Sequence, residues 1–89
     1  MNQNTARVAA EALAAVRNAS AEASAAAEYM DPELHALLVT LTSVAVETTE
    51  QAIRSAGGDA ATLVFWSSSD HAWKPYATEA QQHATAYIL

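Results

Sequence analysis

The chain has 89 residues, no cysteine and a formal net charge of −6 at pH 7. This length suits one domain, residues 1–89. The absence of cysteine excludes a disulfide framework. The acidic balance repels a phosphate backbone and leaves few cations for counterion release, so we expect no nucleic-acid partner.

The first predicted element is a helix from Thr5 to about Tyr29. The segment is rich in alanine, the strongest helix former, and contains neither glycine nor proline. At 100° per residue its apolar residues gather on one face opposite Arg7, Glu11 and Glu22. Those apolar-face positions are Ala9, Leu13, Val16, Ser20, Ala23, Ala27 and Met30.

A second helix is predicted over Pro32–Ala56. Asp31 is a favoured N-cap, Pro32 suits the first helical position, and Glu33 complements the positive end of the helix dipole. Gly57-Gly58 provides the stop, because glycine readily takes the left-handed conformation that closes helices.

The middle of this segment, residues 37–49, reads LLVTLTSVAVETT and is dense in β-branched residues, so an α+β fold with a strand near 37–49 is the alternative. Helical spacing separates apolar from polar positions better than alternation does, and we prefer the helix. It has one apolar stripe through Leu34, Leu37 and Leu41. A second stripe contains Val39, Thr42, Val46 and Ile53, which we predict to be a self-association face.

Beyond the glycines, Asp59 can cap a short helix over Ala60–Trp66. The serines and Asp70 that follow favour a turn. Pro75 then suggests that a last helix begins near it, with Tyr76, His83 and Tyr87 on one face. The predicted fold class is therefore all-α: a long antiparallel helical hairpin with two shorter C-terminal helices.

Two features predict self-association, with a dimer favoured. The chain contains many alanines, which add little bulk to a core, and a domain this small buries only about 60–65% of its unfolded surface. A helix of 25 residues is also about 37 Å long, which exceeds the roughly 31 Å width of a compact globule of this length. A second copy would cover the overhanging apolar faces.

No membrane span or export segment is predicted. The longest strongly apolar run, Leu34 to Val46, is too short and too polar to cross a bilayer. Glu11 interrupts the apolar residues near the N-terminus, where a secretory segment would be continuous. We expect a cytoplasmic protein without a membrane partner.

An aromatic cluster is the most informative candidate site. It comprises Phe65, Trp66, Trp73, Tyr76 and Tyr87, which we predict to bind a partner or a ligand. Tryptophan and tyrosine combine large contact area with a polar group and are common at binding hot spots. The alternative is that they form the main core of a domain whose other helices are rich in alanine.

Catalytic and metal sites have weak support, and we predict no catalytic residues, metal or cofactor. Glu79 and His83 are four residues apart and could share a proton or two metal ligands, but a metal needs three or four. Asp31 and His35 have the same spacing, although Asp31 is better explained as a cap. Residues 67–71, SSSDH, contain nucleophile-site residue types, yet contiguous residues cannot form a triad.

The leading functional hypothesis is a small acidic, non-enzymatic interaction or assembly protein with an aromatic C-terminal contact surface. The alternative is a small-ligand-binding regulatory protein with its pocket among the C-terminal aromatic residues. A third hypothesis is an enzyme that uses Glu79 and His83.

Overall fold

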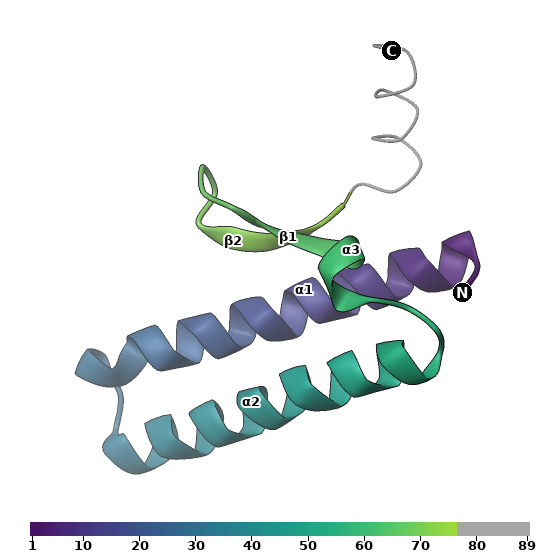
Figure 1. Cartoon of the computed structure of the whole chain (residues 1–89). Coiled ribbons are helices and arrows are strands. Elements are labelled where there is room, and N and C mark those ends of the chain that lie inside the picture. The colour runs from purple at the N-terminus through teal and green to yellow at the C-terminus, as the bar shows by residue number, and fades with distance from the viewer. Residues whose placement is uncertain (77–89) are drawn as a thin grey trace.

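Two long helices and a β-hairpin form three layers in the structure, a computed structural model that describes residues 1–76. The elements in order are α1 (Gln3–Ala25), η1 (Ala26–Tyr29), α2 (Pro32–Ser55), α3 (Ala60–Leu63), β1 (Val64–Ser67) and β2 (Ala72–Pro75). Helix α1 is the middle layer, with antiparallel α2 on one side and the β-hairpin on the other (Figure 1). The molecule is thin and elongated, with extents of 50 × 31 × 15 Å.

The first predicted helix is confirmed, and it starts slightly earlier than expected. Asn2 caps α1, because its Oδ1 accepts a hydrogen bond of 2.8 Å from the backbone N–H of Thr5. The alanine-rich sequence then stays α-helical to Ala25 and tightens into the 3₁₀ turn η1 before the chain reverses.

The second predicted helix is also confirmed, and the alternative strand near residues 37–49 is wrong. The Asp31 carboxylate accepts hydrogen bonds from the backbone N–H groups of Glu33 and Leu34 at 3.1 and 3.2 Å. At the other end Gly57 has φ +86°, and the N–H of Gly58 donates to the carbonyl of Ile53 at 2.9 Å. This is a Schellman-type end. Packing against α1 therefore outweighs the weak helix propensity of the β-branched residues.

The predicted short helix over Ala60–Trp66 is only partly correct. Helix α3 ends at Leu63, and the chain continues as strand β1, which pairs antiparallel with β2. Val64, Phe65 and Trp66 all favour strands, and a partner strand across a four-residue turn decides the outcome. The fold is thus mostly helical with a small two-stranded sheet. Pro75, near which the last helix was predicted to begin, is the final residue of β2. The rest of that predicted helix lies outside the described residues.

The core is small and lies where α1 meets the ends of α2 and β1. It consists of Ala10, Leu13, Ala14, Ile53 and Val64, with Trp73 and Leu63 among the half-buried residues packed against it. Among the described residues, Leu13 is the one large side chain that is completely buried. Alanines elsewhere on α1 allow close approach of its neighbours but bury little area.

We predict that Leu13→Ala lowers the free energy of unfolding by about 2–4 kcal/mol, because it removes buried methyl groups and leaves a cavity. Urea denaturation followed by circular dichroism measures the change. Val8→Ala is the matched control, since Val8 lies on the same helix but is 56% exposed. Equal effects of the two substitutions would contradict the location of the core.

Candidate functional site

The aromatic residues form two pairs on the β-hairpin. Trp66 lies opposite Trp73 in the register, and their ring centroids are 5.7 Å apart in an edge-to-face arrangement. Phe65 and Tyr76 form the other pair, at 4.9 Å. Neighbouring residues of a strand point to opposite faces, so the two pairs occupy opposite faces of the sheet. The structure brings four of the predicted residues together as two pairs, and Tyr87 lies outside the described residues.

The tryptophan face is fastened to α1 by two consecutive residues. The guanidinium of Arg17 lies 4.5 Å from the centre of a Trp73 ring, within the range of a cation–π contact. Asn18 bonds the main chain of the same residue twice: its Oδ1 accepts from the N–H of Trp73 at 2.7 Å, and its Nδ2 donates to the carbonyl at 2.9 Å. Trp73 is therefore a structural anchor, while Trp66 and Tyr76 remain nearly half exposed.

The turn of the hairpin is held by its own polar residues. The hydroxyl of Ser67 donates to the Asp70 carboxylate at 3.3 Å and accepts from the Asp70 N–H at 3.3 Å. Lys74 forms an ion pair with Asp70, and it holds the pKa of the Asp70 carboxyl below its ordinary value of 3.8 through a hydrogen bond and charge attraction. These contacts are those of an ordered turn, and Ser67 and Asp70 are engaged in them.

A stripe of apolar side chains on α2 faces away from α1. We call Leu34, Leu37, Leu41 and Val44 the α2 stripe; they are 48%, 59%, 65% and 56% exposed. Steps of three, four and three residues place all four on one side of the helix over three turns, at coiled-coil spacing. The sequence contains this spacing, but it does not indicate which of the two apolar stripes lies against α1.

The predicted self-association face lies on the α1 side of α2. Ile53 belongs to the core, Thr42 lines a groove against α1, and Val39 and Val46 are half-buried. The reason is the position of Glu50 and Ile53: Glu50 bonds Arg17 at 2.9 Å and Ile53 packs with Leu13, which turns this side of α2 inward. The α2 stripe is left outward.

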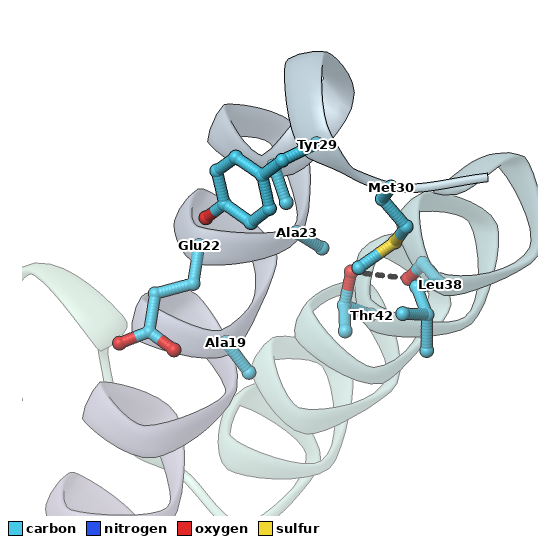
Figure 2. Close-up of a pocket in the computed structure, with 8 residues that line it drawn as sticks. Ala19, Glu22, Ala23, Tyr29, Met30, Leu38 and Thr42 are labelled. Carbon is cyan, nitrogen blue, oxygen red and sulfur yellow. Dashed lines mark hydrogen bonds between the residues drawn. The ribbon is translucent and has the colours of Figure 1, made fainter. Parts of the chain in front are cut away.

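The groove lies between α1 and α2 near the turn that joins them (Figure 2). Its volume is about 360 Å³, and it is lined mainly by small and apolar side chains, with Met30 reaching across toward Leu38 and Thr42. The hydroxyl of Thr42 donates to the carbonyl of Leu38 at 2.7 Å, so a ligand in the groove need not accept a hydrogen bond from it. The groove can accept an apolar group of modest size.

The titratable candidates give no catalytic arrangement within residues 1–76. Asp31 caps α2, as expected, and the Nε2 atom of half-buried His35 is covered and has no hydrogen-bond partner in the described part of the chain. No group of three or more potential metal ligands occurs among the described residues. Glu79 and His83 lie outside them.

Comparisons with known proteins give no relative: no protein-family model, curated protein or solved structure matches the chain. Within residues 1–76, no helix is both long and apolar enough to cross a membrane.

We predict that Asn18→Ala destabilises the protein by about 1–3 kcal/mol, because the N–H and carbonyl of half-buried Trp73 lose their partners. Denaturation followed by tryptophan fluorescence reports the change at the affected ring. Asn4→Ala, an exposed substitution on the same helix, should change stability by less than about 0.5 kcal/mol. Indistinguishable curves for the two variants would show that the Asn18 contacts are unimportant.

A second prediction concerns the pH dependence of the turn. Because the folded-state pKa of Asp70 is lowered, its ionised form stabilises the hairpin above the unfolded pKa, and this contribution disappears as pH falls through the folded pKa. Lys74→Gln removes the ion pair, so the Asp70 pKa should rise toward 3.8. An NMR titration of the Asp70 carboxyl carbon measures it. An unchanged titration in the variant would contradict the assignment.

Proposed function

We propose that the protein is a small, non-enzymatic interaction and assembly protein that self-associates through the α2 stripe. The observation behind the proposal is the exposure of Leu34, Leu37, Leu41 and Val44 on one side of a helix. Scattered exposed apolar residues are normal, but a contiguous row of large ones is typical of a contact surface. Covering the exposed half of each side chain contributes about 1 kcal/mol.

The thin core also supports association. Four of the seven buried apolar residues of the described chain are alanines, and Leu13 is the one large side chain there that is fully buried. The radius of gyration, 15.2 Å, exceeds the roughly 11 Å expected for a compact chain of the described length. An elongated molecule with so little internal burial gains from a partner that lies along its length.

The aromatic hairpin is a second proposed contact surface. Trp66 and Tyr76 each expose nearly half of their surface, and they lie on opposite faces of the two-stranded sheet. On each face one aromatic side chain is exposed, and the ring that it contacts, Trp73 or Phe65, is half-buried. This arrangement suits contact with a protein surface better than enclosure of a small ligand.

A small-ligand-binding regulator is the alternative proposal, and the groove of Figure 2 is what favours it. Its lining of Ala19, Ala23, Met30 and Leu38 would recognise an apolar group, with Glu22 at the margin. This differs from the predicted pocket among the aromatic residues, since those residues face two ways. The enzyme hypothesis rests on Glu79 and His83, which lie outside the described residues.

We predict that the purified protein shows a concentration-dependent monomer–dimer equilibrium in sedimentation experiments, and that Leu41→Glu weakens it at least about tenfold, or 1.4 kcal/mol. The reason is that a carboxylate cannot be buried among apolar side chains without a partner.

Ser43→Glu is the matched control, because it adds the same charge at an exposed position of α2 that points away from the α2 stripe. It should leave association nearly unchanged, and circular dichroism should show that both variants stay folded. A wild-type protein that remains monomeric up to millimolar concentration would overturn the proposed function.

A further inference from the structure

Three alanines of α1 leave the groove between α1 and α2 open. Ala19, Ala23 and Ala26 follow one another at steps of four and three residues, so they share the side of α1 that borders the groove opposite Leu38 and Thr42. Their methyl groups are too short to fill the space between the two helices, and a volume of about 360 Å³ is left. This volume is within the range of sites that bind small molecules.

The lining of the groove is apolar on one side and bears a carboxylate on the other. Figure 2 shows Glu22 and Tyr29 on the α1 side, and Met30, Leu38 and Thr42 on the opposite side. Glu22 and Tyr29 are exposed, so a ligand reaches them without displacing other side chains. The side chain of Met30 is unbranched and adapts to the shape of an apolar group. A ligand in the groove therefore meets mostly apolar side chains, with one carboxylate and one aromatic ring at a single side.

The chain around the groove carries acidic side chains and no lysine or arginine. Residues 18–53, which include every residue that lines the groove, contain six acidic residues and neither basic type. Glu28, Asp31 and Glu33 are exposed and are close in sequence to Met30 of the groove. Charge of one sign around a cleft attracts ligands of the opposite sign and repels those of the same sign.

Glu22 is the acidic residue that lines the groove itself. The ion pairs among the described residues are Arg7–Glu11, Arg17–Glu50 and Lys74–Asp70, so Glu22 has no cationic partner there. Its charge is therefore available to a ligand that has an apolar part in the groove.

We propose that the groove between α1 and α2 binds a lipophilic organic cation, which is an ammonium group on a compact apolar body. This inference rests on the alternative, ligand-binding function and specifies the chemical class of the ligand. The apolar body packs on Ala19, Ala23 and Leu38. The ammonium group lies at the Glu22 carboxylate and the Tyr29 ring, which attract it through an ion pair and a cation–π contact. Both contacts are open to water, so each adds modest affinity.

Three compounds with the same apolar body test the charge preference: phenylbutylammonium, phenylbutanol and phenylbutyrate. A ligand of this size should bind with a Kd on the order of 1 mM. Titration followed by the methyl NMR signals of Ala19, Ala23 and Met30 locates the site and gives the Kd. We expect the cation to bind about fivefold more tightly than the alcohol and the anion to bind most weakly. Added salt should reduce these differences.

Glu22→Gln should weaken binding of the cation about threefold and leave binding of the alcohol unchanged. Glu28→Gln is the matched control, because it removes the same charge at a neighbouring exposed position that does not line the groove. It should leave the affinity for the cation nearly unchanged.

Filling the groove tests its location. Ala19→Leu introduces a larger side chain at an exposed position of the lining, so it should weaken binding of the cation and the alcohol at least about tenfold. Ala21→Leu makes the same change at an exposed position on another side of α1 and should not affect binding. Equal effects of the two substitutions would overturn the proposed site.

A second open groove serves as an internal control. It has a volume of about 420 Å³ and is lined by residues of α1 that carry no charge: Asn4, Thr5, Val8, Ala9 and Ala12. The cation should shift the methyl signals of Ala19 and Ala23 at lower concentration than those of Val8 and Ala12. An equal response of the two grooves would indicate general adsorption to an acidic protein and would overturn the proposal.

The outcomes separate this inference from the function on which it rests. Equal affinity for the alcohol and the cation, or equal effects of Glu22→Gln and Glu28→Gln, would overturn the cationic ligand while leaving a site for an apolar one. No shift of the groove signals with any of the three compounds would overturn both. Sedimentation tests self-association separately.

Discussion

The arrangement of the three layers depends on two consecutive residues of α1. Arg17 bonds Glu50 of α2 through its guanidinium and lies against the Trp73 ring of β2, while Asn18 holds the main chain of Trp73. Arg17 is largely buried, and its positive charge is balanced by the Glu50 carboxylate and the electron-rich face of the indole. These contacts orient α2 and the hairpin about α1 in a region where alanine offers little packing specificity.

That orientation explains why the apolar surface of the molecule is distributed unequally. Once Glu50 and Ile53 are turned toward α1, the helical period directs Thr42 and Val46 to the same side and the α2 stripe to the outside. The β-branched residues of α2 gain contacts on the α1 side only. Within the helix, the hydroxyl of Thr42 donates a hydrogen bond to the carbonyl of Leu38. The large side chains of the α2 stripe stay exposed as a result.

Local sequence features predicted the two helices well and the rest less well. Asp31-Pro32 and Gly57-Gly58 specify their own cap geometry, so α2 could be located from a few residues. The hairpin was missed because Val64, Phe65 and Trp66 directly follow a capped helical turn, and only pairing with β2 makes them a strand. The aromatic cluster could be identified, but its division onto two faces depends on register. The inward side of α2 depends on Arg17 and Leu13, which are distant in sequence.

The edges of the sheet and the exposed side of α2 differ in how another chain could pack against them. On β2, Asn18 occupies the outward N–H and carbonyl of Trp73, and Pro75 has no N–H to offer, so no further strand can add there. Strand β1 is only four residues long, which limits any ladder on its outer side. Helix α2 is 24 residues long, its first N–H groups are bonded by Asp31, and the carbonyls of Ile53 and Arg54 accept from Gly58 and Gly57 at its other end, so contacts through its exposed side chains need no backbone pairing. Strand addition is thus restricted on both sides of the sheet, whereas the proposed association through α2 requires only side-chain packing.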